Sequence, residues 1–143
     1  MQQPVPRPTA ISKPFWDALR ERRIVVPRCD RCGWWIFYPR RHCPRCCSER
    51  LTWTAISGQA TLCSYTIARI PTLAGFAQPA PQNLAIVTLA EGFNMNSALA
   101  GVEPEAMRIG MELRPVFNVI DHTGATRLLF TAADSCDGDN SRH

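Results

Sequence analysis

Two closely spaced pairs of cysteines constrain this chain more than any other feature of its sequence. Cys29 and Cys32 form one C-x-x-C pair, Cys43 and Cys46 form another, and ten residues lie between the pairs. Two such knuckles, joined by a hairpin-length insert, can place four thiolates at the corners of a tetrahedron, the geometry of a structural zinc ion. The spacing therefore predicts a zinc ribbon with one Zn²⁺ ion. Four sulfur ligands leave no open coordination position, so we expect the metal to hold structure and not to activate water.

Other uses of the cysteines fit the sequence less well. Seven cysteines in 143 residues could form a disulfide framework, but the N-terminus lacks the apolar region of a signal peptide. Two C-x-x-C motifs at ribbon spacing are also not typical of a redox site. One alternative stays open, because Cys47 directly follows Cys46 and could replace it as a ligand. Free thiols and a zinc site predict a cytoplasmic location.

β-forming residues surround the knuckles. Residues 24–26 predict a strand that leads into the first knuckle, and residues 34–39, rich in aromatic side chains, predict a strand between the knuckles. A short helix is predicted before them, since Ser12 can cap a helix in which Pro14 is tolerated near the start.

The predicted helix has an apolar face made by Phe15, Trp16 and Leu19. A single short helix cannot bury these side chains alone, so it must dock on its own ribbon or on another subunit. We favour the second, which makes the three residues candidate docking residues for a partner.

After the ribbon, the pattern changes to strands separated by turn residues. Five strands with one helical turn between the third and the fourth is the order of an OB-fold, a small Greek-key barrel. We therefore predict a mainly β fold in which the helix and zinc ribbon pack on a five-stranded OB-fold barrel. The predicted strands are 60–70, 83–89, 93–99, 111–120 and 125–131, with the helical turn at 104–108 and a proline-containing loop at 71–82. The predicted parts are a flexible N-terminus (1–12), the docking helix and ribbon (13–56), the barrel (57–133) and a disordered acidic tail (134–143).

Positive charge is concentrated in the ribbon. The net charge is +4, but residues 20–50 hold nine arginines against three carboxylates, a local balance of +6. Fifteen of the sixteen basic residues are arginine, whose planar guanidinium suits phosphate and carboxylate groups. A solvated face with ion pairs and an anion-binding face are both consistent with this pattern.

No catalytic constellation is evident in the sequence. The imidazole bases are His42 beside a predicted metal ligand, His122 in a predicted turn with Asp121, and His143 in the tail. Cys63 has no basic neighbour and is typical of a small core residue. No run of about 18 apolar residues is present, so we expect no membrane span. Binding is therefore the more consistent role.

One binding role is recognition of single-stranded nucleic acid. Trp34, Trp35, Phe37 and Tyr38 lie among arginines, and such residues can stack on bases and contact phosphates. The alternation places Trp35 and Phe37 on one face, where they could instead be core residues. We expect nucleic acid to be the less favoured partner.

The order of motifs resembles the DUF35 family. The resemblance rests on Pro14-Phe15-Trp16, the two knuckles, Trp53, Ser64-Tyr65-Thr66, Leu89-Ala90-Glu91-Gly92 and Ile109-Gly110-Met111-Glu112-Leu113, and it covers about residues 11–131. It implies an OB-fold protein with a rubredoxin-like zinc ribbon, whose ligands would be Cys29, Cys32, Cys43 and Cys46. The family often has a Pro-Tyr pair at the second barrel strand, where this chain has Pro81-Gln82-Asn83.

The resemblance also implies a partner. Members are similar to accessory subunits of thiolase-fold and related acyl-CoA enzymes, which form or cleave C–C bonds, so we expect a heteromer that shares acyl-CoA as a ligand. CoA carries a 3′-phosphate and a pyrophosphate, which an arginine-rich ribbon would attract. Our hypothesis is that Arg40, Arg41 or Arg45 contributes to this attraction, and that the loop at 71–82 closes over the acyl group.

Overall fold

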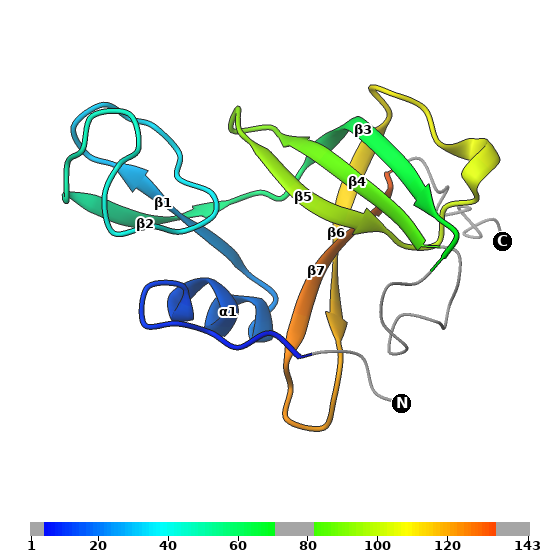
Figure 1. The fold of residues 1–143 in the computed structure, drawn as a ribbon, viewed down its shortest axis with the longest axis horizontal. Helices are drawn as coiled ribbons and strands as arrows, with labels where there is room; N and C mark the ends of the chain where they lie inside the picture. The colour runs from blue at the N-terminus through cyan, green and yellow to red at the C-terminus, as the bar shows by residue number, and fades with distance from the viewer. Residues whose placement is uncertain (1–4, 71–81, 134–143) are drawn as a thin grey trace, which may run out of the picture.

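A helix, a two-stranded ribbon and a five-stranded barrel follow one another along the chain (Figure 1). This computed structural model describes residues 5–70 and 82–133. The predicted tail at 134–143 and nearly all of the predicted loop at 71–82 lie outside the described residues. The helix is α1 (Lys13–Arg20), and the ribbon strands are β1 (Ile24–Cys29) and β2 (Leu51–Ile56). The barrel contains β3 (Ala60–Ala68), β4 (Gln82–Leu89), β5 (Asn94–Leu99), the 3₁₀ turn η2 (Pro104–Ala106), β6 (Glu112–Val119) and β7 (Thr126–Ala132).

The barrel confirms the predicted OB-fold. Its strands close in the order β3-β4-β5-β7-β6, with β6 pairing back to β3, and η2 lies between the third and fourth strands. Alternation along β4 directs Val87 and Leu89 into the core, while Leu84 and Ile86 stay exposed. Phe130 on β7 is fully buried. Every pairing is antiparallel except that of β5 with β7, which is parallel and limited to one residue pair.

The insert between the knuckles differs from the prediction. Residues 34–39 form no strand, and a single bridge joins Trp35 to Arg28. The insert packs in two directions instead: Ile36 is buried between Cys29 and Cys43, and Trp35 and Phe37 pack against the main core. This tertiary packing overrides the strand preference of the aromatic residues.

Aromatic side chains join the ribbon to the barrel. The ring of Trp35 stacks on that of Phe93, which precedes β5, with centroids 5.7 Å apart. Phe37 meets the same ring at 6.2 Å and the ring of Phe15 from α1 at 5.6 Å. The helix, the ribbon and the barrel therefore share one hydrophobic core.

The apolar face of α1 packs within the chain. Phe15 and Leu19 are 3% and 0% exposed and belong to the shared core, so the expected docking of these two side chains on another subunit is wrong in this structure. The physical reason is that the ribbon and barrel together offer α1 a sufficient apolar surface. Trp16 is only partly buried, and its docking role stays a prediction. Ser12 occupies the N-cap position without a capping hydrogen bond, and its hydroxyl accepts one from the Thr9 backbone N–H instead.

Gly58, between β2 and β3, allows the ribbon and barrel to approach closely. Its φ is +82°, and a Cβ added there would lie 2.8 Å from side-chain atoms of Ile24 and Pro115. Gly124 has almost the same φ, +83°, with nothing within 4 Å of an added Cβ. The two glycines therefore differ in crowding and not in backbone conformation.

We predict that Gly58→Ala destabilises the chain more than Gly124→Ala. Both substitutions carry the left-handed backbone cost of about 1–2 kcal/mol, and Gly58→Ala adds overpacking of about 1–3 kcal/mol. Denaturant unfolding of the zinc-loaded chain measures the difference. Equal losses in the two variants would mean that the junction is not tightly packed.

Candidate metal centre

Four cysteine sulfurs meet at the end of the ribbon. The Sγ atoms of Cys29, Cys32, Cys43 and Cys46 all lie within 4.8 Å of one another. The Cys29–Cys46 and Cys32–Cys43 sulfur pairs are 3.5 and 3.6 Å apart. Zinc–sulfur bonds of about 2.3 Å in a tetrahedron place the sulfurs roughly 3.8 Å apart, so the arrangement fits a Zn²⁺ ion. Bound there, zinc would crosslink the knuckles and offer no catalytic coordination position.

The two knuckles have the same backbone turn, which settles the position of Cys47. Gly33 donates its N–H to the carbonyl of Cys29, and Cys47 does the same to Cys43, both at 2.9 Å. Both donors have positive φ, +75° and +63°. Cys47 therefore occupies the position that glycine holds in the first knuckle, and its exposed thiol lies outside the sulfur cluster. Cys46 is the fourth member, as first predicted.

The thiols interact electrostatically because they are so close. A hydrogen bond from the Cys32 backbone, opposed by burial, lowers the pKa of Cys29 to about 6. The Ser48 backbone N–H lowers the pKa of Cys46, but burial and the neighbouring thiols outweigh it and raise that pKa to about 12. Ionising one thiol thus disfavours ionising the next. A divalent cation would remove this conflict and allow four thiolates.

The candidate anion-binding arginines lie on the ribbon surface. Arg40, Arg41 and Arg45 are exposed, and none of them forms an ion pair with another described residue. The Arg45 guanidinium lies 5.0 Å from the ring centroid of Trp34, which is 46% exposed. Their predicted role in binding CoA stays a prediction.

The other polar groups considered at the sequence level have structural partners. His42 lies 2.8 Å from the carboxylate of Glu49, and both side chains are exposed. Asp121 accepts hydrogen bonds from the hydroxyl and backbone N–H of Thr123 at 2.6 and 2.9 Å, which lower its pKa. Cys63 is exposed on β3, so its expected place in the core is wrong, because it alternates with the buried Leu62 and faces outward like Thr61. The described cysteines form no disulfide.

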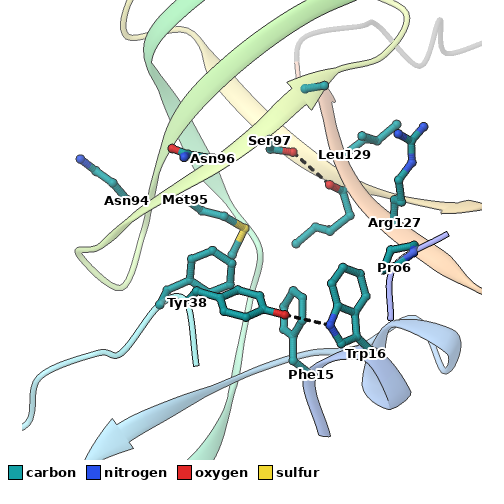
Figure 2. Close-up of a pocket in the computed structure, with 13 residues that line it drawn as sticks. Pro6, Phe15, Trp16, Tyr38, Asn94, Met95, Asn96, Ser97, Arg127 and Leu129 are labelled. Carbon is teal, nitrogen blue, oxygen red and sulfur yellow. Dashed lines mark hydrogen bonds between the residues drawn. The ribbon is translucent and has the colours of Figure 1, made fainter. Parts of the chain in front are cut away.

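Sequence reasoning missed Arg127 and the cavity beside it. Arg127 is the only charged residue of β7, and it lines a cavity that also contacts Trp16 and Tyr38 (Figure 2). The indole N–H of Trp16 donates to the hydroxyl of Tyr38 at 3.1 Å. A lone arginine within an apolar strand was the signal in the sequence that could have identified it.

A short helix, a four-thiol ribbon and a closed five-stranded barrel define a zinc-ribbon OB-fold protein. Two family models match the chain, "ChsH2, rubredoxin-like zinc ribbon domain" at residues 16–52 and "ChsH2, C-terminal OB-fold domain" at residues 53–118. A DUF35 domain-containing scaffold protein of Pyrococcus furiosus is 34% identical over 111 residues, which are 77% of this chain and 79% of that protein. The chain belongs to the DUF35 family, as its motifs predicted.

Two further relatives carry enzyme names. A probable enoyl-CoA hydratase alpha subunit of Thermomonospora curvata is 34% identical over 109 residues, which are 74% of this chain but 33% of that longer protein. A chain of the solved Ltp2-ChsH2(DUF35) aldolase superposes with a TM-score of 0.80 at 27% identity, over 90% of this chain and 98% of that one.

In the described part of the chain, no helix is long and apolar enough to cross a membrane.

We predict that Cys46→Ser loses zinc and that Cys47→Gly keeps it. Cys46→Ser removes one of the four clustered sulfurs, whereas Cys47→Gly supplies the residue best suited to a positive φ. Metal analysis should give one zinc per chain for Cys47→Gly, and thermal unfolding should give this variant a melting temperature no lower than that of the native chain. Cys46→Ser should melt at a lower temperature or fail to fold. Loss of zinc from Cys47→Gly would show that the ligand set is wrong.

Proposed function

We propose that this chain is a non-catalytic accessory subunit of an enzyme complex that acts on acyl-CoA. The partner would form or cleave a C–C bond by thiolase, acyltransferase or retro-aldol chemistry. The observation that carries the proposal is the likeness to a chain of a solved aldolase, of which this chain covers 98%. The names of the scaffold and hydratase-subunit relatives support the same context.

The chemistry of the described residues supports a role without catalysis. The metal site has four sulfur donors and no open position, and the carboxylate of Asp121 is used within its turn. His42 faces Glu49 on an exposed surface, with its Nε2 2.8 Å from the carboxylate. These groups stabilise local structure, so we assign the reacting groups to the partner.

We propose a thiolase-fold or related acyl-CoA enzyme as the partner, in a cytoplasmic hetero-oligomer. The ribbon would face the mouth of the partner's CoA site, where Arg40, Arg41 and Arg45 could attract the phosphates of CoA. Their exposure and lack of ion pairs with described residues leave them available for such contacts. Closure of the loop at 71–82 over the acyl group remains part of this proposal, although residues 71–81 lie outside the described part.

A second candidate is a stand-alone module for single-stranded nucleic acid. The stacking of Arg45 on the exposed ring of Trp34 favours it, because both groups suit bases and phosphates. Two of the four aromatic residues that suggested this role, Trp35 and Phe37, pack on the core and are not free to stack on bases. We therefore rank this function second.

Purification of the complex from the native host tests the proposal. We expect the tagged chain to retain a stoichiometric partner that turns over acyl-CoA, and the isolated chain to show no turnover. Salt-sensitive binding of an oligonucleotide by the isolated chain, without any acyl-CoA enzyme attached, would contradict the proposal and support the second candidate.

In the same complex, replacing Arg40, Arg41 and Arg45 with alanine tests the anion-binding step. Three exposed charge contacts of about 0.2–1 kcal/mol each correspond to roughly a tenfold loss of acyl-CoA affinity at low salt, shrinking as salt is added. The matched control replaces Arg69, Arg108 and Arg114, three exposed arginines outside the ribbon, and should change little. Unchanged affinity in the ribbon variant would remove these arginines from the CoA site.

A further inference from the structure

A groove on the barrel begins where β5 and β7 separate. The two strands pair only at Leu99 and Phe130, and the Ser97 hydroxyl donates to the Leu128 carbonyl at 3.0 Å. Beyond this point they diverge, and α1 covers part of the opening. A cavity of about 490 Å³ remains between them, a volume typical of small-molecule sites.

A second cavity of about 470 Å³ continues the first. Both are lined by Ala98, Arg127 and Leu129, so they meet along the outer face of β5 and β7. Figure 2 shows Arg127 and Leu129 at one end of the first cavity and Tyr38 at the other. Together the cavities form one elongated groove, which we call the β5–β7 groove.

The charge in this groove is unbalanced. Among the described residues that line the two cavities, Arg127 is the only charged one. No described carboxylate forms an ion pair with it. A guanidinium stays protonated at physiological pH, so the groove holds one uncompensated positive charge.

Two buried polar atoms in the groove also lack partners. The Nε of Arg127 and the Oδ1 of Asn83 are shielded from solvent without a hydrogen bond to any described residue. The amide nitrogen of Asn83 is used, since it donates to the Val102 carbonyl at 2.7 Å. A buried polar atom without a partner is costly. Asn83 Oδ1 is an acceptor, which a carboxylate cannot satisfy, so of the two atoms only Arg127 Nε indicates an anionic ligand. A carboxylate is the natural acceptor for Nε–H and the adjacent amino group of an arginine.

Apart from Arg127, the groove is lined by apolar and uncharged polar side chains, the polar ones being Asn94, Asn96 and Ser97 in the first cavity and Gln82, Asn83 and Asn118 in the second. Leu129 lies beside Arg127, and Phe15, Trp16 and Tyr38 form an aromatic wall of the first cavity. A ligand that matches these features has one negative charge and an extended apolar body. A polyphosphate would not match, because the lining offers a single cation.

We propose that the β5–β7 groove binds a small apolar monocarboxylate. The carboxylate accepts hydrogen bonds from the Arg127 guanidinium, and the apolar body lies along Leu129 toward Trp16 and Tyr38. None of Arg40, Arg41 and Arg45 lines either cavity, so this site is separate from the proposed CoA contacts.

Calorimetric titration of the zinc-loaded full chain with octanoate tests the proposal. We expect saturable binding at one site, and at least about tenfold weaker binding of the neutral analogue octanamide, because the charge-assisted hydrogen bonds are lost. Equal affinity for the two probes, or no saturable binding of octanoate, would overturn the proposal.

Two variants locate the site. Arg127→Met keeps an apolar stem and should weaken octanoate about tenfold or more, whereas Arg114→Met, an exposed arginine on β6 outside both cavities, should bind like the native chain. Ala98→Leu, which leaves the charge in place, should block the groove and weaken octanoate without loss of zinc. Unchanged binding in Arg127→Met, or equal weakening in Arg114→Met, would overturn the assignment. The test needs no partner, so its failure leaves the proposed function untouched.

Discussion

Four cysteine sulfurs lie close enough to share one cation, and the rest of the ribbon is built around this cluster. Without a cation, ionisation of one thiol opposes ionisation of its neighbours within 4.8 Å, so the thiol pKa differs between about 6 at Cys29 and about 12 at Cys46. With zinc, the two knuckles become one rigid unit. The insert between them then presents Trp35 and Phe37 to Phe93 and Phe15, so the metal also organises the junction with the barrel.

Local chemistry explains why much of the fold could be predicted from the sequence. Turn residues separate the barrel strands, and the alternation of Val87 and Leu89 with exposed residues marks the buried face of β4. The C-x-x-C spacing identified the ligands because a four-thiolate zinc site needs that geometry. Comparison of the two knuckles could also have excluded Cys47 as a ligand, because Cys47 occupies the position that Gly33 holds in the first knuckle.

Long-range packing explains what the sequence did not reveal. The insert resembled a strand, but Ile36 packs with the ligand cysteines, whereas Trp35 and Phe37 pack against the core shared with the barrel. The apolar face of α1 resembled a docking surface for a partner. In this chain it is covered by ribbon and barrel residues that are distant from α1 in the sequence. The β5–β7 groove likewise forms where two strands diverge, and only Arg127 within an apolar strand gave a local sign of it.

We propose that the chain is a scaffold and that the chemistry resides in a partner. Removal of zinc from the reconstituted complex with a chelator measures this dependence most directly, with assembly followed by sedimentation and turnover of acyl-CoA measured in parallel. The account predicts that the complex dissociates as zinc leaves, that activity falls with assembly, and that added zinc restores both. A complex that stays assembled and active after complete removal of the metal would contradict it.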